Sequence, residues 1–123
     1  MTGIEWIARE RKRQTDKLDW SPEHDDRHDS GELALVAALY ASPERLYAKH
    51  EYAAGLRFED PFPNDWGDAR PHNGNVLKDA TDEEAIRLLK KAGALIAAEI
   101  DRLLRKKATR GHQGPRRRIS PSP

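Results

Sequence analysis

The sequence predicts an all-α protein, a small bundle of about four helices with one long loop and a disordered basic C-terminal tail. Apolar residues recur at helical spacing in several segments, and Ser, Thr and Pro residues stand where helices would begin. No segment has a convincing strand pattern. A chain of 123 residues is expected to form one domain. We place this helical domain at residues 1–108 and the flexible tail at residues 109–123.

The first half of the chain is expected to hold two long helices. A helix over residues 2–18 begins with a capping box between Thr2 and Glu5. Its predicted apolar face consists of Ile4, Ile7, Ala8 and Leu18. Residues 19–31 are rich in turn formers, and a second helix follows over residues 30–41. The second helix is apolar almost all round, which favours burial on most sides, including against a second subunit.

A third helix and a long loop are expected next. Residues 42–44, Ser-Pro-Glu, resemble a helix start, and the helix would run to about Ala54, with Gly55 as its stop. Residues 56–79 contain three prolines and two glycines, and they predict one long loop. Such a loop is either a lid or binding loop, or a tolerated insertion. Three aromatic residues are expected to pin it to the helices: Phe58, Phe62 and Trp66.

The last helix, over residues 82–107, has the clearest pattern in the chain. Thr81 and Glu84 predict a second capping box at its start. Lys90 and Lys91 lie on its polar flank and are interpreted as solvated. Its broad apolar stripe consists of Ala85, Leu88, Leu89, Ala92, Leu95, Ile96, Ile100, Leu103 and Leu104.

The composition argues against several functional classes. The 22 Lys and Arg residues balance 21 Asp and Glu residues to a net charge of +1, which disfavours nucleic-acid binding across the whole surface. Cysteine is absent, so disulfides and thiolate metal sites are excluded. No apolar run is long enough to span a bilayer, and a cytoplasmic protein is expected. A basic patch near the C-terminus makes nucleic acid a third, least favoured partner: Arg105, Lys106, Lys107 and Arg116–Arg118.

Three charged residues interrupt the apolar faces of their own helices. Arg11 lies seven residues after Ile4, and Gln14 follows it on a neighbouring part of that face. Glu32 and Glu99 stand at equivalent positions in the second and last helices. A buried charge must be paired, bound to a metal or reached by water. We expect Arg11, Glu32 and Glu99 to meet one another or a shared ligand. The alternatives are a buried ion-pair network that fixes helix register, or charged ends that extend into solvent.

Six residues within a stretch of ten are considered as metal ligands: Glu23, His24, Asp25, Asp26, His28 and Glu32. Carboxylates such as Asp25 and Asp26 suit magnesium, and the imidazoles of His24 and His28 widen the choice to zinc or iron. The two histidines share a face only if this stretch is helical. The alternative is a solvated loop that caps a helix. Trp20, just before this segment, is either a core residue or a stacking surface for a base.

Four segments of the sequence resemble a group of small bacteriophage and prophage proteins. They are ARERKRQ at residues 8–14, WSPEHDDRH at 20–28, GELALVAALYA at 31–41 and KKAGALIAAEIDRL at 90–103. The resemblance implies a phage or prophage origin and brings no assigned activity.

More distantly, the arrangement is similar to MazG-like nucleotide pyrophosphohydrolases. That likeness implies an oligomeric, all-helical, Mg²⁺-dependent enzyme that uses acidic residues on facing helices. The E-x-x-E and E-x-x-D pairs of those enzymes have no convincing counterpart here. Only Glu32 and Glu99, with Asp101 nearby, stand in for them.

The resulting hypothesis is a homo-oligomeric protein that binds a nucleotide or another phosphorylated small molecule. In its enzymatic version, Glu32, Glu99 and Asp25 or Asp26 hold Mg²⁺ and Arg11 pairs with a phosphate oxygen. The predicted ligand-binding residues are Arg11, Gln14, Trp20, His24, His28, Glu32 and Glu99. The sequence does not decide whether the protein is an enzyme. The alternative is a non-enzymatic accessory protein that binds a host protein or sequesters a nucleotide signal of host defence.

Overall fold

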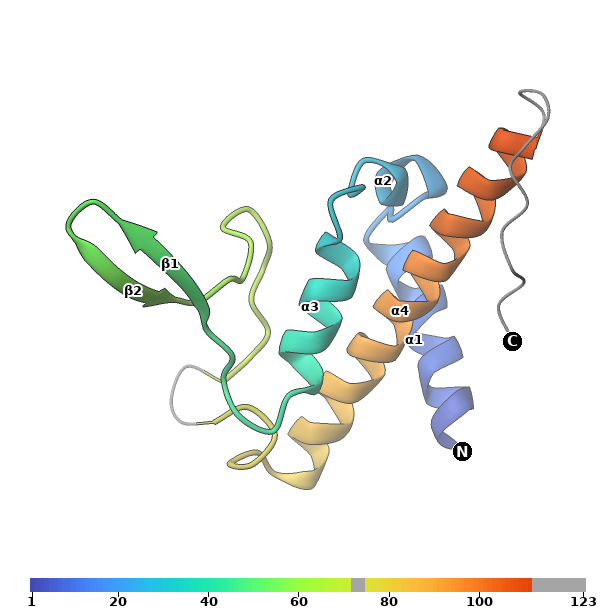
Figure 1. The fold of residues 1–123 in the computed structure, drawn as a ribbon. Coiled ribbons are helices and arrows are strands. Elements are labelled where there is room, and N and C mark those ends of the chain that lie inside the picture. Colours follow the sequence, from blue (N-terminus) through green and yellow to red (C-terminus); the bar gives the residue numbers. More distant parts are fainter. Residues whose placement is uncertain (72–74, 112–123) are drawn as a thin grey trace.

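The computed structural model describes residues 1–71 and 75–111, and it contains helices together with a β-hairpin. Figure 1 shows the helices side by side, with the hairpin projecting away from them. The elements in chain order are α1 (Gly3–Lys17), α2 (Pro22–Asp26), α3 (Glu32–Ala41), β1 (Ala48–Tyr52), β2 (Gly55–Glu59) and α4 (Asp82–Gly111).

The all-α prediction is therefore wrong. Part of the segment that was expected to form a third helix belongs instead to a two-stranded antiparallel sheet. The strands pair from Ala48 opposite Glu59 to Tyr52 opposite Gly55. Gly55 adopts a φ of 126°, a conformation open to glycine, so the residue expected to stop a helix begins β2 directly after the turn at residues 53–54. Aromatic and apolar residues on both strands favour the extended conformation over the weak apolar stripe of the predicted helix.

The core lies where α3 packs against α4. α3 buries one helix face completely, with Leu33 and Val36 at 0% exposure, while Leu35 stays 36% exposed. α4 contributes residues at helical spacings of four, three and three: Leu88, Ala92, Leu95 and Ala98. The loop after the hairpin is pinned as predicted by Phe62 and Trp66, which pack on this core. Phe58 does not take part and is 66% exposed.

The first helix buries a different face from the predicted one. Its capping box between Thr2 and Glu5 forms as expected. The fully buried residues are Glu10 and Gln14, whereas Ile4 is 81% exposed. α1 approaches α4 closely at a glycine, because a Cβ on Gly93 would lie 2.5 Å from Ile7 Cδ1. α1 is therefore held against α4 by the close contact at Gly93 and by its buried polar residues Glu10 and Gln14.

The last helix extends further than predicted. It continues to Gly111, so residues 109–111 belong to α4 and not to the tail. The remainder of the predicted tail, with Arg116–Arg118, lies outside the described residues. None of the described helices combines the length and apolar character needed to cross a bilayer.

Candidate ligand-binding pocket

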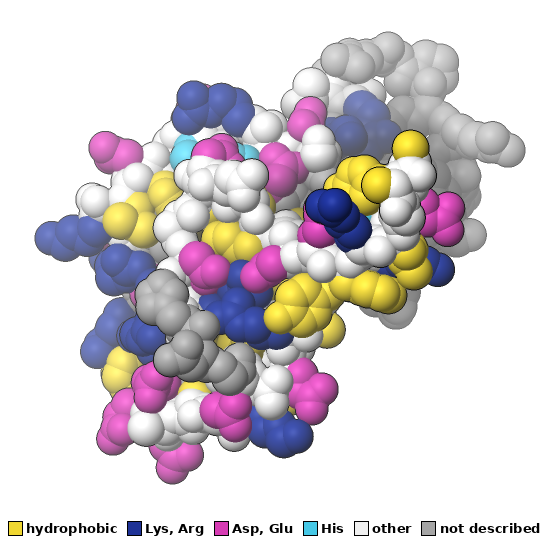
Figure 2. All heavy atoms as spheres, turned by 90° about the vertical axis from the view of Figure 1, so that its left-hand side faces the viewer, with side chains coloured by type: hydrophobic (Ala, Val, Ile, Leu, Met, Phe, Trp, Pro, Cys, Tyr) yellow, Lys and Arg dark blue, Asp and Glu magenta, His cyan; other side chains and the backbone are white. Residues whose placement is uncertain are grey.

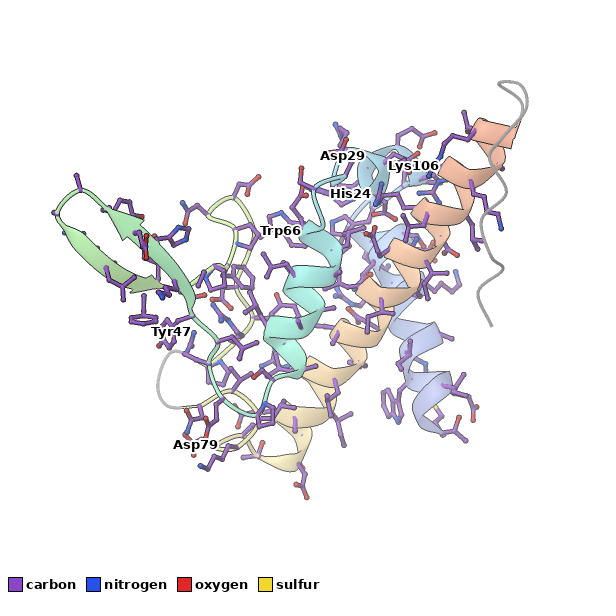
Figure 3. All side chains as sticks on the ribbon, in the orientation of Figure 1. His24, Asp29, Tyr47, Trp66, Asp79 and Lys106 are labelled. Atoms are coloured by element: carbon purple, nitrogen blue, oxygen red, sulfur yellow. The ribbon has the colours of Figure 1, made fainter. Side chains whose placement is uncertain are left out.

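A pocket of about 480 Å³ lies where α1, α2, α3 and α4 meet the loop that follows the hairpin. In Figure 3, His24 on α2 and Trp66 on that loop lie at the same end of α3. The aromatic residues that line the pocket are Trp20, His24, His28, Tyr40 and Trp66. The polar part consists of Arg13, Gln14, Asp65 and Lys91.

Four aromatic rings form a continuous wall. Trp20 stacks on His24 with ring centroids 5.2 Å apart and an angle of 8° between the planes. His28 meets both His24 and Trp66 edge to face, with centroids 4.9 Å apart in each case. Ser21 starts α2 by accepting a hydrogen bond from the His24 backbone. α2 ends at Asp26, so His28 follows the helix, and the two imidazoles nevertheless meet edge to face.

Gln14 supplies the most unusual polar group of the pocket. Only 2% of this residue is exposed. Its Nε2 donates to Glu10 Oε2 at 3.3 Å, which fixes the amide and leaves Oε1 as the free acceptor. Gln14 Oε1 is buried and has no hydrogen-bond partner among the described residues. An unsatisfied buried acceptor costs about 1–3 kcal/mol, so a ligand N–H that reached it would recover that energy.

Two cations and one buried carboxylate lie beside Gln14. Arg13 donates two hydrogen bonds of 2.8 Å to Glu10, and Lys91 Nζ lies 3.5 Å from Glu10 Oε2. Burial lowers the pKa of Lys91. Burial acts to raise the pKa of Glu10, but the hydrogen bonds from Arg13 and the charge of Lys91 hold it below its ordinary value. The positive charges of Arg13 and Lys91 therefore lie together on the side of the pocket next to Glu10, and Asp65 adds a second carboxylate to the site.

Tyr40 ties the loop to the helical body. Its hydroxyl donates to the Gly67 carbonyl at 3.2 Å and accepts from the Ala69 N–H at 3.3 Å. Burial raises the pKa of this phenol. These bonds hold the segment that carries Trp66 against the pocket, so the loop is part of the wall.

The structure separates the three charged residues that were expected to meet. Each has a different partner within residues 1–71 and 75–111. Arg11 donates to Asp25 at 3.0 Å, and Glu99 accepts two hydrogen bonds from Arg102. Glu32 pairs with His28 at 3.2 Å and accepts from the Ser30 N–H. The three residues therefore form separate contacts, one between α1 and α2 and two between neighbours in sequence, in place of one shared network. Of the predicted ligand-binding residues, Gln14, Trp20, His24 and His28 line the pocket, and the other three do not.

The predicted metal ligands are also held by other side chains. Asp25 is fully buried between Arg11 and His24, and Asp26 pairs with Arg105 at 2.8 Å. In the part of the chain that the structure describes, no three or more His, Asp or Glu residues are grouped to hold a metal ion. Mg²⁺ binding by Glu32, Glu99, Asp25 and Asp26 stays a prediction.

Several pocket residues were not anticipated from the sequence. Lys91 was interpreted as solvated, yet its side chain is 20% exposed and faces Glu10. The signal was present in the spacing of Glu10, Arg13 and Gln14, because residues three and four apart share a helix face. Tyr40 and Asp65 join the pocket through the fold of the chain, which no local pattern shows.

A scan of protein-family models and searches of curated proteins and of solved structures each find no match to this chain. The functional argument therefore rests on the pocket itself.

Proposed function

We propose that the protein binds a nucleotide-like phosphorylated ligand in this pocket. The observation that carries the proposal is the unpartnered Gln14 Oε1 beside an aromatic wall and two cations. A nucleotide offers matching groups, namely a planar base with N–H donors and an anionic phosphate. The pocket volume of about 480 Å³ lies within the range of small-molecule sites.

The aromatic wall would receive the base. Stacking of a base on an aromatic side chain contributes about 1–3 kcal/mol and tolerates any base. Selectivity would come from Gln14, because its Oε1 can only accept a hydrogen bond while Nε2 is held by Glu10. The site would therefore favour a base with an exocyclic amine or ring N–H at that position.

The phosphate would lie near Arg13 and Lys91. Hydrogen bonds between charged groups are roughly twice as strong as neutral ones, and both cations are partly buried. Glu10 already occupies part of their hydrogen-bonding capacity, so the ligand competes with an internal ion pair. We expect a pocket that favours a compact anion over a long polyphosphate chain.

The proposal is for binding. Hydrolysis with Mg²⁺ would require carboxylates such as Asp25 and Glu99 to leave their arginine partners. Sequestration of a nucleotide needs no such rearrangement, so this part of the non-enzymatic alternative agrees with the same geometry. Homo-oligomer formation is also proposed, and a surface for it lies on α4.

Isothermal titration calorimetry with nucleosides, nucleoside monophosphates and nucleoside triphosphates tests the proposal. We expect saturable binding of at least one phosphorylated nucleotide, and a loss of about tenfold or more in affinity for Lys91→Met. Lys90→Met is the matched control, because Lys90 lies over the Trp6 ring, away from the pocket. Absence of binding across the panel, or equal losses in both variants, would contradict the proposal.

A second candidate function, binding of a host protein, is favoured by the hairpin. Tyr47, Leu56 and Phe58 are 56%, 50% and 66% exposed. Figure 2 shows hydrophobic side chains at the surface of the face that carries the hairpin. Affinity capture from a bacterial lysate should recover a stoichiometric protein with the natural chain and lose it with Leu56→Ser and Phe58→Ser. Recovery that is equal with both chains would reject the hairpin as the contact.

A further inference from the structure

The outer face of α4 is apolar although neither α1 nor α3 covers it. The inner face buries Leu88, Leu95 and Ala98 in the core. On the outer face, Leu89, Ile96 and Leu103 are 45%, 49% and 46% exposed. Ile100, between the last two, is 52% exposed. A helix that is apolar on both faces is typical of one that is buried on both sides.

The spacing of these residues is that of a coiled-coil seam. Leu89 and Leu103 each lie seven residues from Ile96, and Ile100 lies four residues after it. Apolar residues repeating at seven, with a second at three or four, form the seam between packed helices. Leu89 and Leu103 lie equally far from Ile96, so two copies of α4 running in opposite directions would place Leu89 of each opposite Leu103 of the other; Ile100 has no apolar counterpart of its size, because the mirrored position is the buried Ala92.

The charges of α4 have the same symmetry. Its first turn carries Asp82, Glu83 and Glu84, and its last turns carry Lys106 and Arg110, which are exposed. Asp82 lies fourteen residues before Ile96 and Arg110 lies fourteen residues after it. In an antiparallel pair, each acidic end would face a basic end, whereas a parallel pair would bring like charges together.

We propose that α4 pairs with α4 of a second copy of this chain, antiparallel about a twofold axis at Ile96. Such an interface is isologous, with the same patch contributed by both copies. It would cover the exposed apolar stripe and match the helix charges in one arrangement. The ligand pocket lies on the opposite side of α4 from the stripe, toward Leu95 and Lys91, so dimerisation leaves it accessible.

Sedimentation equilibrium of the full chain tests the oligomeric state. We expect a dimer, and a shift to monomer for Ile96→Glu, because two carboxylates would meet at the axis. Ile4→Glu is the control, since Ile4 is 81% exposed and lies on α1. Circular dichroism should show equal helicity in both variants. A monomeric natural chain at high concentration, or a dimer unaffected by Ile96→Glu, would overturn the proposal.

The direction of pairing is tested by charge exchange and by cross-linking. Asp82→Lys alone and Arg110→Glu alone should each weaken the dimer, and the double variant should restore it, which a parallel pair would not do. Because the chain has no cysteine, Ile96→Cys gives a single thiol per copy. Oxidation should produce a covalent dimer much faster than with Ile4→Cys. Equal rates, or no restoration in the double variant, would contradict an axis at Ile96.

Discussion

The pocket and the hairpin depart in opposite ways from the usual burial of apolar side chains and exposure of polar ones. In the pocket, Glu10 and Gln14 are polar and 2% exposed, while on the hairpin Phe58 is apolar and 66% exposed. Buried polar groups and exposed apolar patches are the informative departures from ordinary burial. The two departures differ in consequence, because Glu10 and Gln14 are buried and hydrogen-bonded to each other, whereas Phe58 is mostly in solvent. The pocket is therefore expected to be sensitive to small changes that the hairpin tolerates.

The largest effect is expected at Asp25, which anchors the end of the pocket. Asp25→Ala would remove the carboxylate that accepts from Arg11 at 3.0 Å and leave only Asp101, 3.8 Å away, while Arg11 Nη1 already lacks a partner. Loss of one partner from a buried pair costs about 3–5 kcal/mol. Asp26→Ala, next to it on α2 and exposed, should cost less than about 1 kcal/mol. Urea denaturation measures both, and equal losses would contradict a special role of Asp25.

Two phenylalanines compare the loop with the hairpin directly. Phe62 packs on the core and carries the Arg70 guanidinium 4.6 Å from its ring centroid, whereas Phe58 is exposed. Phe62→Ala should lower the free energy of unfolding by about 2–3 kcal/mol and Phe58→Ala by less than about 0.5 kcal/mol. Thermal and urea denaturation would show the difference. A large loss at Phe58 would mean that the hairpin contributes to the folded core.

Gln14→Leu should have opposite effects on stability and on binding. It removes the unpartnered Oε1 and also the 3.3 Å bond from Nε2 to Glu10, whose carboxylate keeps Arg13 and Lys91, so the free energy of unfolding should rise by less than about 1 kcal/mol in the absence of ligand. Nucleotide affinity should fall by about tenfold, because the acceptor for the base is lost. Denaturation and calorimetry on the same preparation give both values. A less stable Gln14→Leu protein with unchanged affinity would exclude Gln14 as a recognition residue.

The smallest effect is expected from titration of Glu10. Its pKa is held below the ordinary value of 4.5, so its carboxylate binds protons less readily when folded. Its contribution to stability is present above the unfolded pKa and is lost as pH falls through the folded pKa. The stability difference between the natural chain and Glu10→Gln should therefore shrink as pH falls below about 4.5. A constant difference from neutral to acid pH would contradict this assignment.

Local signals predicted the helices better than they predicted the contacts. The capping box at Thr2 and the start of α4 are set by residues within one turn, so the sequence specifies them. The hairpin was missed because Ser42-Pro43-Glu44 resembles a helix start, and strand pairing depends on residues across the turn. The pairing of Arg11 with Asp25 was missed because it joins two helices, and a helix pattern shows that a charge faces inward without showing what it meets.

Part of the pocket was predictable because some of its residues are close together in sequence. Trp20, His24 and His28 lie close together in sequence, so their grouping is local. Trp66 lies on a loop some forty residues later, and Lys91 lies on α4. Only folding brings these two residues to the pocket, so local sequence does not show them there. Glu10 stands three and four residues before Arg13 and Gln14, yet its burial depended on where α1 meets α4.

Tryptophan fluorescence tests ligand binding in the pocket most directly. Two of the three tryptophans, Trp20 and Trp66, line the pocket, so a Trp6→Phe chain reports from that site alone. Titration with a phosphorylated nucleotide should give a saturable change in emission that Gln14→Leu weakens. A signal that stays unchanged, or changes only linearly, up to millimolar concentrations of every nucleotide would contradict the proposed site.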